Sequence, residues 1–219
     1  MVVIDVTLPK KLYRYSERRW LERSLTHGEF RLRPASDYAL EERSKARHDN
    51  ELRRSFALPG ATVTVAATGQ KLKTKGDVMF ESRMNSDYLT LCLASQWAPH
   101  LFNDFEGSDA CLVIHDPEKF RSRMNAASSS ALPEWIGVDG PVTYGHDSPL
   151  GVPFIKSLQF SFQFEWRFVW VHPTARACRP VTISLGNLQD IAELVDAPVD
   201  PAPNNTLQPT GHASGAAGG

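Results

Sequence analysis

The residues from Ser161 to Val171 read Ser-Phe-Gln-Phe-Glu-Trp-Arg-Phe-Val-Trp-Val, so apolar and polar side chains alternate over most of the stretch. A period of two residues predicts a β-strand, because successive side chains of a strand point to opposite faces. The apolar face would carry Phe162, Phe164, Trp166, Phe168 and Trp170, and the polar face Gln163, Glu165 and Arg167. Three long polar side chains on one face form either a solvated ion-pair ladder or one wall of a polar binding site. The pattern leaves both interpretations open.

Segments on both sides of this stretch predict the rest of an α+β domain. Strands are expected at residues 12–15, 29–33, 61–66, 87–93, 110–115, 141–144 and 181–185. Helices are expected at residues 17–25, 34–55, within 95–105, at 116–125 and at 188–195, with a linker at 128–130. These elements indicate a mixed or mainly antiparallel sheet with short flanking helices. We expect one domain over residues 1–196.

Residues 197–219 differ in composition from this domain. Pro, Asn, Gly and Ala dominate, and the apolar content is too low for a packed core, which predicts a disordered tail. Within the tail, the stretch Pro203–Thr210 resembles the peptides produced when the reading frame of a mobile gene cassette runs into its integron recombination site. This resemblance implies a bacterial accessory gene of adaptive or defensive use. An ordinary disordered tail is the alternative.

The charges are distributed unevenly along the chain. The formal net charge of −1 excludes a globally basic nucleic-acid-binding protein. Residues 1–84 nevertheless carry 17 Lys and Arg against 11 Asp and Glu, and residues 85–219 carry 7 against 14. The two parts are therefore +6 and −7. Either oppositely charged surfaces face water or each other, or the N-terminal part attracts a phosphate-bearing ligand.

Three cysteines, Cys92, Cys111 and Cys178, occur at spacings that match no metal or redox motif, so no metal site is expected. Two of them lie in apolar runs, where a free cysteine is most often a small buried hydrophobe. Nucleophilic pairs of Cys92 with His100 or Cys111 with His115 are disfavoured, because such pairs rarely arise from neighbours in sequence. The first residues lack the basic start and apolar stretch of a signal peptide, and no run reaches membrane-spanning length. We expect a cytoplasmic protein without a membrane partner.

The opening Leu12–Ser16 (Leu-Tyr-Arg-Tyr-Ser), with the predicted helix, His27-Gly28 and a second strand after it, is similar to the start of ADP-ribosyltransferase-like domains. A second motif of that superfamily, a strand ending in small hydroxyl residues, is matched in part by Leu91–Ser95. The third is a late strand whose catalytic Glu follows a Gln or Glu two residues earlier, as in Gln163-Phe164-Glu165. The resemblance implies a split sheet and an NAD substrate.

The resemblance also implies a role for each matching residue. Arg14 and Ser16 would bind the cofactor NAD, and Ser95 would order the cleft. Glu165 would be catalytic, and Gln163 would orient the acceptor. These residue types suit the chemistry, because cleavage of the nicotinamide bond develops positive charge on the ribose, which a carboxylate stabilises. An arginine can bind a pyrophosphate through two parallel hydrogen bonds.

A second resemblance covers more of the chain. The Tyr-Arg-Tyr opening, the segment from Cys92 to Phe105, and Phe154-Ile155-Lys156 ahead of Phe164-Glu165-Trp166-Arg167 look like a widespread bacterial family without a settled activity. Its members have a Tyr-Lys-Tyr-like opening, an Asn-Asp-Pro-Phe-Glu motif and a terminal Lys before a Glu-x-Arg strand. This chain departs from the family, because Phe102–Glu106 lacks the proline and lies later in the sequence. Lys156 and Arg167 are further candidate contacts for phosphate or substrate.

The leading hypothesis is therefore an NAD-using, ADP-ribosyltransferase-like cassette protein, a toxin or phage-defence effector with a protein or nucleic-acid acceptor. It requires Arg14 and Glu165 to face one concave pocket. The competing hypothesis is a non-enzymatic binding module, an adaptor or immunity protein anchored by Trp97, Trp135 and Trp170. A third hypothesis is nucleic-acid binding through the basic N-terminal part.

Overall fold

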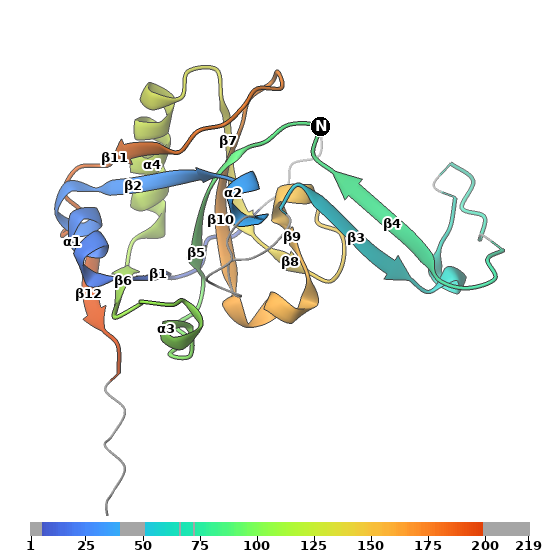
Figure 1. The fold of residues 1–219 in the computed structure, drawn as a ribbon, viewed down its shortest axis with the longest axis horizontal. Coiled ribbons are helices and arrows are strands. Elements are labelled where there is room, and N and C mark those ends of the chain that lie inside the picture. The colour runs from blue at the N-terminus through green and yellow to red at the C-terminus, as the bar shows by residue number, and fades with distance from the viewer. Residues whose placement is uncertain (1–5, 40–50, 66, 72, 199–219) are drawn as a thin grey trace, which may run out of the picture.

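The computed structural model describes residues 6–39, 51–65, 67–71 and 73–198. Eight strands form one sheet in the order β11-β2-β5-β1-β6-β12, with β10 on the other edge of β5 and β7 beyond it. They are β1 (Leu12–Ser16), β2 (Glu29–Pro34), β5 (Leu89–Ala94), β6 (Ala110–Ile114), β7 (Ile136–Pro141), β10 (Glu165–Val171), β11 (Val181–Ser184) and β12 (Ala192–Asp196). All pairings in this sheet are antiparallel, so the predicted α+β class is confirmed (Figure 1).

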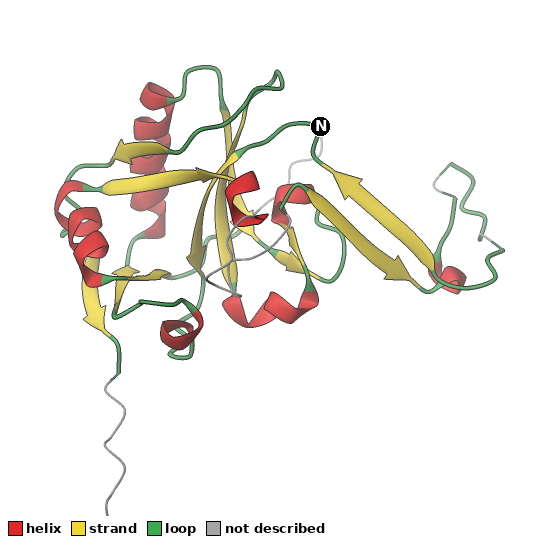
Figure 2. Cartoon of the chain, viewed as in Figure 1, coloured by secondary structure: helices red, strands yellow, loops and turns green. Residues whose placement is uncertain are grey.

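Short helices flank the sheet, as Figure 2 shows. They are α1 (Arg18–His27), α2 (Ser36–Ala39), α3 (Leu101–Asp104) and α4 (Pro117–Ala131), with the 3-10 turns η1 (Gly60–Thr62), η2 (Val152–Phe154) and η3 (Leu158–Gln163). On β6, Leu112 packs in the same cluster as Phe120 of α4, whereas Val113 packs with Leu101 of α3. Neighbouring strand residues point to opposite faces, so α4 and α3 cover opposite faces of the sheet.

The apolar face predicted for β10 is confirmed where the strand exists. Trp166, Phe168 and Trp170 all lie in the main hydrophobic cluster. The predicted strand is too long at its start, however, because residues 158–163 form η3 and β10 begins only at Glu165. The first residues of the alternating pattern therefore approach the sheet as a 3-10 turn.

The sheet is split along one edge of β5. The start of β5 pairs with β2 through Leu89 and Thr90, and its end pairs with β1 through Ala94. The other edge of β5 pairs with β10 along its whole length. Between β1 and β2 a gap opens beside Cys92, and this gap positions the candidate site.

Three predicted elements are wrong. Residues 34–55 are not one helix, because α2 ends at Ala39 and β3 (Arg53–Leu58) follows; residues 40–50 lie outside the described part. Residues 61–65 hold the end of η1 and a bridge from Thr64 to Lys71 instead of a strand, and residue 66 lies outside the described part. Residues 188–195 end in β12 rather than in a helix, because pairing with β6 completes the edge of the sheet.

The helix predicted at 116–125 is longer than expected. Asp116 accepts a hydrogen bond from the backbone N–H of Lys119 and caps α4, and Pro117 occupies its first turn. Ser128 continues the helix with a buried side chain, so the linker predicted at 128–130 is wrong. Of the predicted tail, residues 199–219 lie outside the described residues.

A two-stranded arm projects from the body. It consists of β3 and β4 (Val78–Arg83), paired antiparallel over six residues each, and it extends away from the sheet to the right in Figure 1. A small parallel pair, β8 (Thr143–Tyr144) and β9 (Ile155–Lys156), lies near its base. None of the helices in the described residues is both long enough and apolar enough to cross a bilayer.

Candidate functional site

A cavity of about 200 Å³ lies beside the gap where β1 and β2 separate from β5. Five of the seven residues nominated from the sequence line it: Arg14, Ser16, Lys156, Gln163 and Glu165. They come from β1, β9, η3 and β10, which are far apart in the chain. The structure therefore brings Arg14 and Glu165 to one concave site.

Glu165 is buried and held by two cations. Arg167 donates from Nε to Oε1 at 2.5 Å, and Lys156 donates from Nζ to Oε2 at 3.0 Å. Burial by itself would raise the pKa of the Glu165 carboxyl, but attraction to Arg167 and Lys156 outweighs burial and lowers this pKa well below its ordinary value of 4.5. A charged carboxylate therefore borders the cavity at neutral pH.

Arg167 lies behind this carboxylate and is fully buried. Its guanidinium donates to both oxygens of Glu51, at 2.5 and 2.8 Å, and to both oxygens of Glu165, at 2.5 and 3.4 Å. The remaining donor contacts the Pro153 carbonyl oxygen at 2.6 Å. All five N–H groups are thus used, which corrects two expectations: Arg167 is no direct substrate contact, and the pair it forms with Glu165 is no solvated ladder.

Lys156 connects Glu165 to Gln163. Its Nζ donates to Gln163 Oε1 at 2.7 Å and lies 4.8 Å from the centre of the Phe160 ring. An ammonium group can only donate, so the amide oxygen of Gln163 faces Lys156 and the amide nitrogen is turned away from it. Lys156 thereby sets the orientation of a polar side chain that borders the cavity.

Gln163 and Glu165 do not share the site through strand alternation. Phe164, between them, has φ 47° and ψ 46°, the left-handed conformation that costs a non-glycine residue roughly 1–2 kcal/mol. Ser95 holds this residue in place, because its backbone N–H and its Oγ donate to the Phe164 carbonyl oxygen at 2.7 and 2.8 Å. Ser95 does not line the cavity, so the expectation that it contacts the cofactor is wrong. It positions the turn at Phe164 instead.

Arg14 reaches into the gap of the split sheet. Its Nη1 donates to the Cys92 carbonyl oxygen at 3.0 Å. Ser16 follows two residues later on the same strand, and the N-cap position of α1 belongs to Glu17. Arg14 and Ser16 therefore line the cavity from β1, whereas Glu165 lines it from β10.

The residues that line the cavity without having been nominated from the sequence include Arg33, Tyr38 and Glu51. The guanidinium of Arg33 lies 4.9 Å from the centre of the Tyr38 ring. Burial raises the pKa of the Tyr38 hydroxyl, so it is a neutral donor. Period-two alternation in β2 places Arg33 on its polar face, but nothing in the sequence connects Glu51 to Arg167.

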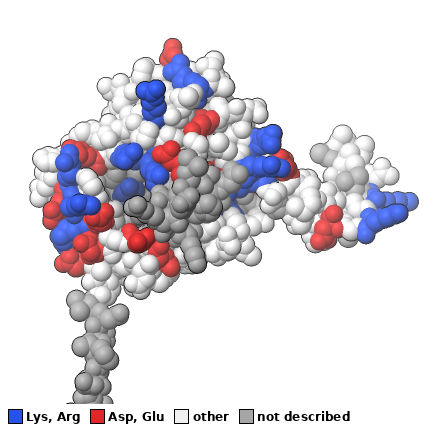
Figure 3. Space-filling view, viewed as in Figure 1, with Lys and Arg blue, Asp and Glu red and all other residues white. Residues whose placement is uncertain are grey.

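A second hollow of about 510 Å³ lies between α1 and β2 and shares Arg14, Ser16 and Arg33 with the cavity. Trp20 of α1 and Arg31 of β2 also line it. We call it the α1–β2 groove. Lys and Arg side chains gather with acidic ones over this end of the body in Figure 3. The cavity and the groove therefore form adjoining parts of one cleft.

The cysteine and histidine candidates lack the properties of nucleophilic pairs. Burial raises the pKa of Cys92 and of Cys111 to about 12, so both are neutral thiols at pH 7. His100 contacts the Phe162 carbonyl oxygen at 3.1 Å, and His115 contacts Glu193 at 3.1 Å. Within the described ranges no three His, Cys, Asp or Glu side chains lie together as metal ligands do.

The tryptophans proposed as binding anchors have different environments. Trp170 is buried in the core, so it is no anchor. Trp97 is 38% exposed and packs against Tyr13, Tyr15 and Phe102. Trp135 is partly buried against the main hydrophobic cluster, so the three tryptophans do not form one exposed apolar patch.

Comparisons of this chain with models of protein families, with curated proteins and with solved structures found no match.

Proposed function

We propose that this chain is an NAD-using, ADP-ribosyltransferase-like protein. The observation that carries the proposal is the position of Arg14 and Glu165 on the walls of one cavity beside the gap of a split sheet. An arginine suits the pyrophosphate of NAD, and an ionised carboxylate suits the ribose from which nicotinamide departs. Four of the five residues that the sequence resemblance nominated line this cavity, and only Ser95 does not.

The chemistry assigned to the site is a substitution at the ribose carbon that bears nicotinamide. The bond from that carbon to nitrogen breaks, its electron pair leaves with nicotinamide, and an acceptor oxygen or nitrogen forms the new bond and loses its proton. Glu165 stabilises the positive charge that develops on the sugar. Its attraction to Arg167 and Lys156 keeps it ionised and fixed for this role.

The volume of the cavity supports a division of the proposed substrate between the two parts of the cleft. About 200 Å³ is below the roughly 300–1,000 Å³ of pockets that enclose a drug-sized ligand. The cavity therefore suits the nicotinamide and its ribose, and the remainder of NAD would pass Arg14 and Arg33. The resemblance of the tail to cassette-derived peptides adds the proposal that this activity belongs to a bacterial toxin or phage-defence effector.

The test combines binding with turnover. Millimolar NAD should raise the melting temperature of the native protein, because a ligand that binds only the folded state stabilises it. Arg14→Ala should reduce this shift, whereas Arg83→Ala, an exposed arginine on the arm, should leave it unchanged. Glu165→Gln should retain a shift but release nicotinamide from NAD at least ~100-fold more slowly, as for loss of one preorganised electrostatic group.

Water can replace the unknown acceptor in the turnover assay, so the assay follows hydrolysis of NAD. The released nicotinamide is measured by chromatography. Glu193→Gln is the matched control, since this glutamate is exposed on β12. The absence of any NAD-induced shift in the native protein contradicts the proposal, as does equal nicotinamide release by native protein and Glu165→Gln.

A further inference from the structure

The α1–β2 groove has the lining of a ligand site and lies outside the Glu165 cavity. Its volume of about 510 Å³ falls within the range of roughly 300–1,000 Å³ that small-molecule sites occupy. Leu21 and Phe30, which are almost wholly buried, border the groove, and its polar wall includes Arg31, Arg33 and Thr182. Such a hollow presents several polar side chains to one space of a size that suits a small ligand.

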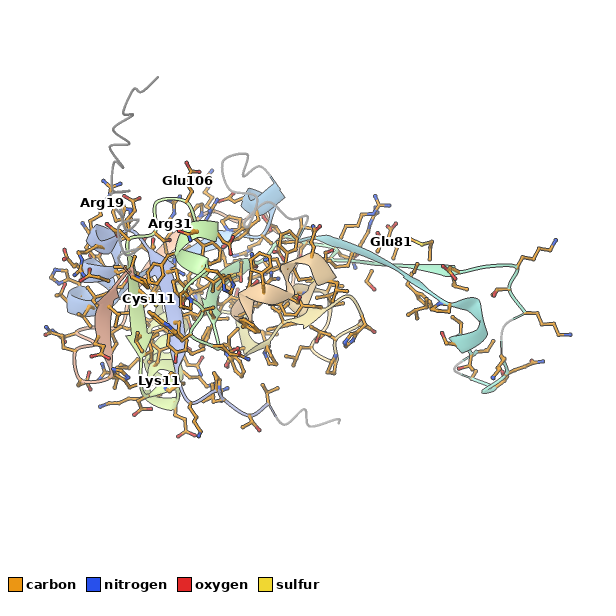
Figure 4. The ribbon with its side chains drawn as sticks, turned by 90° about the horizontal axis from the view of Figure 1, so that it is seen from below. Lys11, Arg19, Arg31, Glu81, Glu106 and Cys111 are labelled. Carbon is orange, nitrogen blue, oxygen red and sulfur yellow. The ribbon has the colours of Figure 1, made fainter. Side chains whose placement is uncertain are left out.

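The basic character of the groove follows from the strand pattern of β2. Phe30 and Leu32 are buried in the core, so Glu29, Arg31 and Arg33 lie on the opposite face. Arg31 pairs across the sheet with Thr182 of β11, which also lines the groove. Figure 4 shows Arg31 and Arg19 on the same side of the body, opposite Lys11.

Among the described residues that line the groove, Glu29 carries the one carboxylate, and Arg23 already neutralises it. Glu29 receives two hydrogen bonds from Arg23, from Nε at 2.7 Å and from Nη2 at 3.0 Å. Arg31 is exposed and forms no salt bridge with another residue of the described part. The groove therefore presents a guanidinium whose charge Glu29 does not cancel, and this favours an anionic ligand.

An aromatic side chain borders the same groove. Trp20 is 50% exposed although its indole is large and apolar. Arg19 lies over its ring at 4.8 Å, and Glu17 accepts a hydrogen bond from its Nε1 at 3.3 Å. An indole held in this way offers a flat surface for stacking, and every nucleobase has a complementary face.

We propose that the α1–β2 groove binds a nucleoside diphosphate, with the base against Trp20 and the phosphates on Arg31 and Arg33. A phosphate needs several donors, which the arginine-rich wall supplies, and the indole selects a base over inorganic phosphate. The ligand source is either free ADP or the ADP portion of a dinucleotide such as NAD, because both carry the same groups. Binding of ADP in the groove does not depend on Glu165 or on turnover.

The probe is ADP, titrated calorimetrically into the native protein and into Arg31→Gln, Trp20→Ala and Trp20→Phe. Stacking on an aromatic side chain is worth ~1–3 kcal/mol per base, so Trp20→Ala should weaken ADP binding roughly 5- to 150-fold, with Trp20→Phe between the two. Arg31→Gln should weaken it about 10-fold, as for loss of a hydrogen bond to a charged group. Controls are Trp97→Phe and Arg83→Gln, which change a tryptophan and an arginine outside the groove.

Two further arms separate the ligand sources and the two proposals. If NAD uses the groove as well as the cavity, Arg31→Gln weakens NAD and ADP alike, whereas Glu165→Gln leaves ADP binding unchanged. ADP binding that depends on Trp20 and Arg31 supports the groove even where NAD is not cleaved. The groove proposal is overturned if millimolar ADP gives no binding heat, or if ADP affinity is equal in the native protein, Trp20→Ala and Arg31→Gln. NAD cleavage could persist in that case.

Discussion

At the scale of single residues, Arg167 decides how the site is held. A buried guanidinium is costly unless its charge and all its donors find partners, and Glu51 and Glu165 supply both. Burial lowers the pKa of the Arg167 guanidinium, but attraction to the two carboxylates raises this pKa by more. Arg167 therefore stays charged. The polar residues of β10 are therefore buried, and they support the wall of the cavity.

Replacing Arg167 by Met should lower the free energy of unfolding by about 3–5 kcal/mol, because it leaves two buried carboxylates without their shared partner. Arg167→Lys should also destabilise, since one ammonium group cannot make the five contacts of the guanidinium. Urea denaturation measures both. Arg83→Met, at an exposed position, should stay within roughly 0.5 kcal/mol of the native protein. Native-like stability of Arg167→Met would contradict this account.

The pH dependence of stability tests the ionised state of Glu165. Its pKa in the folded protein lies below the ordinary value of 4.5, so the folded state binds this proton less readily than the unfolded state does. The contribution of Glu165 is therefore present above pH 4.5 and is lost as pH falls through the folded pKa. Below pH 4.5, titration of Glu165 should lower the free energy of unfolding by up to ~1.4 kcal/mol for each unit by which the pH falls. Denaturation midpoints of Glu165→Gln should fall less steeply with acidification; parallel pH curves would refute the ionised state.

At the scale of elements, the junction of η3 and β10 decides where the polar side chains point. A continuous strand through residues 161–171 would place Gln163 and Glu165 on one face by alternation. The left-handed Phe164 instead ends a 3-10 turn, and Ser95 on the neighbouring segment accommodates it. Sequence periodicity does not report such a turn, because the apolar positions satisfy the strand pattern in either conformation.

Ser95→Ala should loosen this junction. Loss of the hydroxyl donor to the Phe164 carbonyl should cost about 1 kcal/mol of folding free energy. Because Gln163 is then less firmly placed, NAD affinity should fall while ADP affinity in the α1–β2 groove stays unchanged. Ser55→Ala, exposed on β3, is the control for both measurements. An equal fall in NAD and ADP affinity would argue against a local effect of Ser95.

At the scale of the whole molecule, the structure consists of a packed body and a projecting arm. The hydrophobic clusters lie almost entirely in the body, whereas β3 and β4 pair mainly with each other. The base of the arm is nevertheless tied to the site, because Arg54 and Arg167 both contact Glu51. The outer arm and its base therefore differ in their importance for folding.

Replacing residues 60–76 by a short turn should preserve the fold, with a melting temperature within about 4 °C of the native value, equivalent to roughly 1 kcal/mol for a chain of this size. The replacement spares Glu51 and Arg54 and the paired strands. Differential scanning calorimetry measures the shift. As a comparison, Glu51→Ala should destabilise far more, since it removes the buried carboxylate that both Arg167 and Arg54 contact. A large loss of stability on tip replacement would show that the outer arm belongs to the core.

The sequence by itself determined the α+β class, the buried aromatic face of β10 and five of the residues that line the cavity. It could do so because strand alternation is local, and because Arg14, Gln163 and Glu165 lie in short motifs. Only the tertiary structure decided that 188–195 ends in a strand, that Arg167 lies behind the site, and that Glu51 completes it. These outcomes depend on which segments pack together, and neither a sheet edge nor a buried ion pair leaves a periodic signal in the chain.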